Sequence, residues 1–289
     1  MAAPTNLNRR IAIIGSNGQL GSDLMKVMAG RDVVGLTHSQ IDITQPESIK
    51  QALDLYKPHI VINTAAFNRV DDCELHPEEG LLVNAAGVCN LAYACRAFGA
   101  ALVHFSTDYV FDGLKTEPYT ENDLPNPISA YGISKLAGEL FVGYILDRYF
   151  VIRTCGLYGK KGSRGKGGNF VETMLRLGKE GRQIKVVNDQ TLTPTFTLDL
   201  ARKVAELITG ERYGLYHITS AGECTWYDFA LKVFVFAGIR ADVQPISSKE
   251  YGSAARRPRY SVLQNLRLMQ AGIEDMRPWE EALRTYLAE

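Results

Sequence analysis

Two side chains four residues apart, Tyr131 and Lys135, have the types and the spacing of an acid–base pair. On a helix, positions i and i+4 share one face, so the phenol and the ammonium group point the same way. A nearby ammonium group favours the phenolate, and we expect Lys135 to lower the pKa of Tyr131 towards working pH. Such a tyrosine can exchange a proton with a carbonyl or alcohol oxygen. Ser106 and Thr107 end an apolar run, and a hydroxyl there can donate to the same oxygen.

A glycine-rich segment, GSNGQLG at 15–21, fits the phosphates of a dinucleotide. Gly15 permits a tight turn, Gly18 lets the backbone approach a pyrophosphate, and Gly21 lets a helix pack on a strand. The helix that follows offers free N–H groups and a positive dipole end to the phosphates. A purely structural turn is the alternative. The position between the first apolar run and the first amphipathic segment favours dinucleotide binding.

The second apolar run ends in GLTHS at 35–39, without the acidic residue that often binds the ribose 2′-OH of NAD. It also lacks an arginine for the 2′-phosphate of NADP. His38 and Ser39 can bond either group. The choice between NADH and NADPH therefore stays open, and we favour NADPH.

Strands and helices alternate along the first half of the chain. The apolar patterns predict strands at 10–15, 32–36, 59–64, 101–107 and 150–154. They predict helices at 18–29, 46–56, 77–98 and 130–145. This alternation is typical of a parallel, doubly wound α/β sheet of Rossmann type, in which ligands bind at the carboxyl ends of the strands.

The pattern changes after residue 157. Further helices are predicted at 169–181, 197–209, 225–237 and 277–288, with shorter strands at 184–188, 214–219 and 242–246. We interpret residues 1–157 as the dinucleotide-binding domain, with its sheet completed by parts of 169–221. Residues 158–289 would form mainly a smaller α/β substrate-binding lobe.

Composition excludes several functions. Thirty-two basic and 32 acidic residues give no net charge, which argues against a nucleic-acid binder or a polybasic membrane protein. We expect no spanning helix, since no run approaches about 18 apolar residues, and the polar first ten residues show no secretory signal. The five cysteines and five histidines are dispersed, and no metal site is predicted. Asp71, Asp72 and Glu74 are interpreted as carboxylates at a helix start. A cytoplasmic protein without nucleic-acid or membrane partners is expected.

Beyond these motifs, the chain resembles the extended short-chain dehydrogenase/reductase family over nearly its whole length. The strings that carry the resemblance are NTAAFNRVDDCE (63–74), STDYVFDG (106–113), YGISKLAGE (131–139), NFVETMLRL (169–177), VNDQTLTPT (187–195) and RPRYSVL (257–263). Within the family, the likeness is to reductases of nucleotide-activated 4-keto deoxysugars. It implies NADPH- or NADH-dependent reduction of the keto group, with dTDP-4-dehydro-L-rhamnose as the expected substrate.

The resemblance also implies site residues. The implied catalytic residues are Thr107, Tyr131 and Lys135. The implied cofactor contacts are Asn17, Gly18, Gln19 and Leu20 at the pyrophosphate, Asp42 and Ile43 beside the adenine, and Ala65, Ala66 and Phe67 beyond the third strand. The implied substrate contacts are Asp108 and Tyr109 at the sugar nucleotide and Arg257 at the diphosphate. Some members of the family bind Mg²⁺ through glutamates at a dimer contact, but those glutamate positions cannot be matched to residues of this sequence. The oligomeric state, monomer or homodimer, is left open.

Two departures and two alternatives accompany the resemblance. Gly156 stands where the family reductases carry a tryptophan. The basic loop at 160–168 is longer than expected. This loop is either a lid over the substrate diphosphate or a solvated loop. A dehydratase or epimerase is one alternative, although a dehydratase would need a second carboxylate where Tyr109 stands. The other is a non-catalytic NADP-binding regulatory subunit like the beta subunit of methionine adenosyltransferase, which resembles the same reductases.

Overall fold

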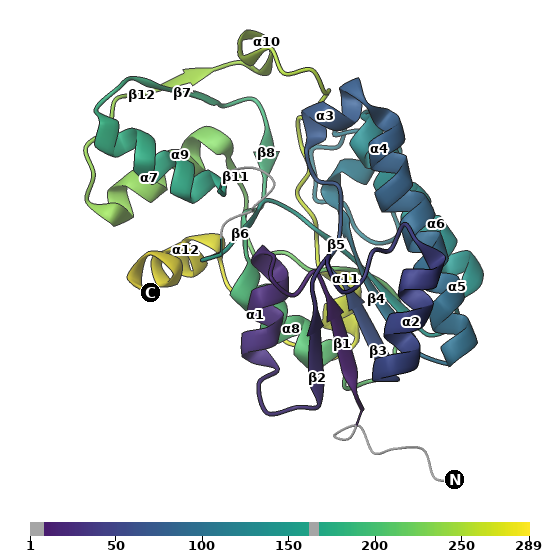
Figure 1. Ribbon diagram of the computed structural model, residues 1–289. Helices are drawn as coiled ribbons and strands as arrows, with labels where there is room; N and C mark the ends of the chain where they lie inside the picture. The colour runs from purple at the N-terminus through teal and green to yellow at the C-terminus, as the bar shows by residue number, and fades with distance from the viewer. Residues whose placement is uncertain (1–8, 162–167) are drawn as a thin grey trace.

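The computed structural model describes residues 9–161 and 168–289 of the chain (Figure 1). Within these residues, parallel strands form a six-stranded sheet in the order β10-β5-β4-β3-β1-β2. The strands are β1 (Ile11–Ile14), β2 (Val33–Leu36), β3 (Ile60–Asn63), β4 (Ala101–Thr107), β5 (Tyr149–Thr154) and β10 (Gly214–His217). The predicted Rossmann-type α/β fold is confirmed.

Strand β1 shows why these strands are continuous apolar runs. Its residues Ile11 and Ile13 pack into the core on one face of the sheet, whereas Ala12 and Ile14 pack into the core on the other. A strand covered on both faces has no solvent-exposed positions, so its sequence does not alternate between apolar and polar residues.

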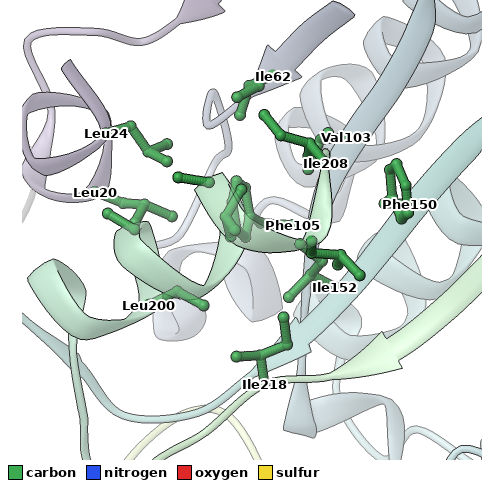
Figure 2. Packing of buried hydrophobic residues seen from close by; sticks show 14 of the residues in the cluster. Leu20, Leu24, Ile62, Val103, Phe105, Phe150, Ile152, Leu200, Ile208 and Ile218 are labelled. Carbon is green, nitrogen blue, oxygen red and sulfur yellow. The ribbon is translucent and has the colours of Figure 1, made fainter. Parts of the chain in front are cut away.

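Helices cover both faces of the sheet. On one face lie α1 (Gln19–Val27), α8 (Thr197–Leu207) and α11 (Leu266–Gln270). Figure 2 shows Leu20 and Leu24 of α1 and Leu200 of α8 packed together with Phe105 of β4 and Ile152 of β5. On the opposite face lie α2 (Pro46–Tyr56), α5 (Val88–Phe98) and α6 (Ala130–Ile145). The two helical layers fix the carboxyl ends of the strands at one edge of the sheet.

The helix predicted over 77–98 is not a single α-helix. It consists of α4 (Pro77–Leu81), a π-helical segment (Leu82–Gly87) and α5. The whole segment Pro77–Phe98 is long and apolar enough to span a membrane, which corrects the expectation that no segment is. However, Val88, Leu91, Ala92 and Cys95 are buried against the sheet, as in the core helix of a soluble protein.

A second, smaller lobe lies beside the sheet (Figure 1). In it, β7 (Ile184–Val187) pairs with β12 (Val243–Ile246), β6 (Leu157–Tyr158) with β9 (Thr195–Phe196), and β8 (Thr191–Leu192) with β11 (Cys224–Thr225). Its helices are α7 (Phe170–Glu180), α9 (Trp226–Ala237), α10 (Ser248–Tyr251) and α12 (Trp279–Ala288). An aromatic core that includes Tyr158, Phe196, Phe229 and Trp279 holds the lobe together. The remaining helices of the described chain are α3 (Val70–Leu75) and a 3-10 turn (Asp108–Val110).

Candidate active site

The main cavity opens at the carboxyl ends of the sheet strands. Strand β1 pairs with β2 on one side and β3 on the other, so the chain order reverses there, and ligands of open α/β sheets bind at such a point. The cavity has a volume of about 1150 Å³ and is lined by residues of both the sheet domain and the second lobe. It therefore has room for a dinucleotide and a second ligand.

The glycine segment forms one wall and fits a dinucleotide phosphate group. Gly15 has φ +76°, and a Cβ on Gly21 would lie 2.1 Å from the Gly15 carbonyl oxygen. Gly18 and Gln19 line the cavity where α1 begins, and no side chain caps this helix. Its first N–H groups therefore lack intrahelical partners and can bind an anion. The backbone is thus shaped to bring phosphates against the start of α1.

Most of the implied cofactor residues line this cavity: Gly15, Asn17, Gly18, Gln19, Leu20, Ile43, Ala65, Ala66 and Phe67. Gly21 is not among the lining residues, because its place is the close contact between α1 and the Gly15 turn. Asp42 is also outside the lining. Its Oδ1 accepts hydrogen bonds from the Thr44 N–H at 2.9 Å and the Thr44 hydroxyl at 2.8 Å, which lower the pKa of Asp42. The adenine contact of Asp42 stays a prediction.

The loop after β3 is held by Asn84, a residue that the sequence analysis missed. Asn84 lies in the π-helical segment and is buried. Its Oδ1 accepts a hydrogen bond from the Phe67 N–H, and its Nδ2 donates to the Phe67 carbonyl, both at 2.9 Å. Nδ2 also donates to the hydroxyl of Ser134 on α6 at 3.0 Å. The sequence signal was an asparagine inside an apolar helical run, which Asn90 shares, and π-helical turns often occur at functional sites.

Thr107, Tyr131 and Lys135 meet on the opposite wall. Thr107 ends β4, and Tyr131 lies in the first turn of α6. Lys135, one turn further, is 2% exposed, and its Nζ donates to the carbonyl of Phe105 on β4 at 2.6 Å. All three line the cavity. Burial lowers the pKa of Lys135 to about 8.

The expectation that Lys135 lowers the pKa of Tyr131 is wrong. Burial raises the pKa of Tyr131, the charge of Asp108 raises it further, and the nearby Thr107 hydroxyl lowers it, whereas Lys135 does not contribute. The physical reason is that the ammonium group is directed to the Phe105 carbonyl. Tyr131 is consequently a neutral phenol at physiological pH, the form that can donate a proton.

Asp108 follows Thr107 in the chain and is 4% exposed. Its Oδ1 accepts a hydrogen bond from the Thr107 hydroxyl at 3.0 Å, and its Oδ2 accepts one from the Cys155 thiol at 3.0 Å. Burial raises the pKa of this carboxyl group. The ring of Tyr109 meets that of Tyr131 edge to face, with centroids 5.8 Å apart. Asp108 and Tyr109 line the cavity together with Tyr131, and their contact with a substrate stays a prediction.

The second lobe supplies the rest of the lining. Arg257 faces the cavity and forms an ion pair with Asp71 of α3 at 2.7 Å. Gly156, in the place of the family tryptophan, has φ +55°, and a Cβ there would lie 3.0 Å from Leu192. An aromatic surface is offered instead by Phe170 and Trp226, which line the cavity with centroids 4.7 Å apart. The sequence analysis did not identify either residue.

The structure also bears on the basic loop and on metal binding. Of the basic loop 160–168, residues 162–167 lie outside the described residues, and Lys160 is placed over the Tyr286 ring at 4.4 Å. Among residues 9–161 and 168–289 there is no group of three or more His, Cys, Asp or Glu side chains suited to a metal ion.

Comparisons with known proteins agree with this geometry. A family model described as RmlD substrate binding domain matches residues 9–289. The chain is 39% identical to the spore coat polysaccharide biosynthesis protein SpsK of Bacillus subtilis, covering 97% of each chain. It is 39% identical to a dTDP-4-keto-6-deoxy-D-glucose reductase of Streptomyces niveus, covering 95% of each chain. The crystal structure of a dTDP-4-dehydrorhamnose reductase from Bacillus anthracis in complex with NADP superposes with a TM-score of 0.94 at 41% identity, covering 97% of this chain and 99% of that one.

Proposed function

The chain belongs to the RmlD substrate-binding domain family of extended short-chain dehydrogenase/reductases, and from this premise we propose that it is an NADPH-dependent reductase of dTDP-4-keto-6-deoxysugars. Full-length coverage of the NADP-bound relative supports NADPH as the cofactor. The observation that carries the proposal is that Thr107, Tyr131 and Lys135 line the same cavity as the glycine turn.

Each site residue has a separate role in the proposed reduction of a ketone. Bound NADPH supplies the hydride. Thr107 turns its hydroxyl proton from Asp108 to the keto oxygen, and Tyr131 gives that oxygen its phenolic proton as negative charge develops. Lys135 holds the ribose of the cofactor. Gly15, residues 17–20 and the loop of residues 65–67 orient the dinucleotide, since their atoms line the cavity.

For the substrate we propose dTDP-4-dehydro-L-rhamnose, reduced to dTDP-L-rhamnose. The NADP-bound relative named for this activity, at 41% identity, supports the choice. Arg257 would bind the diphosphate, and Asp108 and Tyr109 would contact the sugar. The relative from Streptomyces niveus acts on a different 4-keto sugar at 39% identity, so both dTDP sugars belong in the assay. We propose a cytoplasmic enzyme, monomeric or homodimeric, without nucleic-acid or membrane partners.

Replacing Tyr131 with phenylalanine tests this function. Tyr131→Phe removes the proton donor but keeps the ring, so turnover with NADPH and the dTDP sugar should fall by about 10²–10⁴-fold. The affinity for NADPH, measured by fluorescence titration, should stay within about two-fold, which corresponds to less than about 0.5 kcal/mol. Tyr144→Phe is the matched control, because Tyr144 lies on the same helix and is 84% exposed. Unchanged turnover in Tyr131→Phe contradicts the proposal.

The assay also separates the alternatives. A reductase oxidises one NADPH for each sugar reduced, whereas an epimerase or a dehydratase shows no net oxidation of the cofactor. A regulatory subunit would bind NADPH without consuming it in the presence of any dTDP sugar.

A further inference from the structure

Asp71 of α3 holds the side chain of Arg257 through a two-pronged contact. Arg257 Nη2 donates to Asp71 Oδ2 at 2.7 Å, and Nη1 donates to Oδ1 at 3.2 Å. Oδ1 also accepts a hydrogen bond from the Ala255 N–H at 3.0 Å, so the carboxylate fixes the backbone of the same segment. Such paired charge-assisted bonds define the plane and the direction of a guanidinium group.

The two partners differ in their relation to the cavity. Arg257 lines it, and its side chain is 17% exposed, whereas Asp71 is outside the lining, and its side chain is 42% exposed. Asp71 is therefore placed to act on the cavity through Arg257. The segment around Arg257 is itself packed tightly, since a Cβ on Gly113 would lie 2.6 Å from the Arg259 backbone nitrogen and 2.7 Å from the Pro258 Cα.

We propose that Asp71 is a positioning residue that holds the Arg257 guanidinium ready for the diphosphate of the substrate. This inference rests on the proposed function, because it takes a dTDP sugar as the ligand. Asp71 also lies one residue beyond Val70, which lines the cavity at the end of the loop after β3. A single carboxylate thus ties the loop on the cofactor side to the arginine on the substrate side.

Two opposing effects of Asp71 decide the direction of the test. Its negative charge repels a bound diphosphate, and its hydrogen bonds save the cost of ordering a flexible arginine side chain on binding. The charge is half-exposed and screened by solvent, so the repulsion is small. The ordering effect should dominate, and removal of the carboxylate should weaken substrate binding.

The experiment measures the affinity for dTDP by calorimetry in the presence of saturating NADP⁺. Asp71→Ala should weaken dTDP binding about ten-fold, with Asp71→Asn between the variant and the wild type, because the amide keeps one acceptor. In steady state, KM for the dTDP sugar should rise by a similar factor, while kcat changes by less than about two-fold, since uniform binding is lost. Asp72→Ala is the control: Asp72 lies on the same helix and pairs with Arg69 at 3.1 Å.

The outcomes are distinguishable. Unchanged or tighter dTDP binding in both Asp71 variants, with a normal melting temperature, overturns the positioning role and leaves the proposed function intact. Loss of affinity in Asp72→Ala equal to that in Asp71→Ala also overturns it, because the effect would then be one of general charge. If the wild type binds NADP⁺ but no dTDP, the proposed substrate class itself fails. If Asp71→Ala does not fold, the comparison of Asp71→Asn with the wild type decides.

Discussion

The ion pair of Glu139 and Arg153 beneath the active site offers a test of how α6 is held on the sheet. Glu139 lies one turn beyond Lys135 on α6, and Arg153 lies on β5. Arg153 Nε and Nη2 donate to the Glu139 carboxylate at 2.9 Å and 2.7 Å, and the two side chains are 3% and 7% exposed. The guanidinium also lies over the Phe111 ring at 5.1 Å.

Glu139→Ala removes the carboxylate and leaves a buried guanidinium charge without its ion-pair partner. Breaking a buried pair in this way costs about 3–5 kcal/mol of unfolding free energy, because the remaining charge stays desolvated. Total stabilities are about 5–15 kcal/mol, so the loss should be a large part of the whole. Urea unfolding followed by circular dichroism measures it, with an unchanged denaturant slope showing that the folded and unfolded states are comparable.

The chain supplies a matched control for this variant. Glu180 pairs with Arg176 at 2.8 Å on the exposed surface of α7, so Glu180→Ala should cost less than about 1 kcal/mol. A double variant, Glu139→Leu with Arg153→Met, should recover much of the stability lost in Glu139→Ala, because no buried charge remains. A loss in Glu139→Ala as small as in Glu180→Ala would refute the reasoning.

Three further predictions concern Gly21 and Lys135. Gly21→Ala should abolish NADPH binding measurable by fluorescence, because its Cβ would lie 2.1 Å from the Gly15 carbonyl oxygen. Gly30→Ala is the control, since this positive-φ glycine has open space around it, and its NADPH affinity should stay intact. Equal binding of NADPH by both variants would contradict the packing argument. The pKa of Lys135 is lowered to about 8 in the folded protein, so kcat/KM should fall above about pH 8 as the ammonium group loses its proton, and Lys135→Arg should move this limb to higher pH. Between about pH 8 and 10.5 the unfolded chain binds the additional proton, so Lys135 should make the unfolding free energy rise with pH over this window, a rise that Lys135→Met should remove.

Local sequence patterns predicted the elements that build the cavity. The apolar run before Gly15 and the Tyr131/Lys135 spacing are short-range signals, and each depends on geometry within a single strand–turn or helix. Consequently, the strands β1 to β5 and helix α6 were placed within a residue or two at most ends. The Rossmann-type sheet follows from their alternation, including the late strand β10 that pairs with β5.

Interactions between distant segments could not be predicted in the same way. The bond of Asn84 to Phe67 depends on a π-helical turn that shifts the face of the helix, and the apolar periodicity of 77–98 does not show such a turn. The pairing of Asp71 with Arg257 joins residues 186 positions apart. The pKa of Tyr131 depends on burial, which the Tyr131/Lys135 spacing does not contain. In each case, the tertiary contact rather than the local pattern determines the chemistry.

The most direct test of the account is an assay of the stoichiometry of NADPH oxidation and sugar reduction. Wild-type protein, NADPH and dTDP-4-dehydro-L-rhamnose are mixed, and the loss of nicotinamide absorbance is compared with the dTDP-L-rhamnose formed. The account predicts one NADPH oxidised for each sugar reduced, with the rate lost in Tyr131→Phe and kept in Tyr144→Phe. NADPH binding without oxidation by either this sugar or dTDP-4-keto-6-deoxy-D-glucose would contradict it.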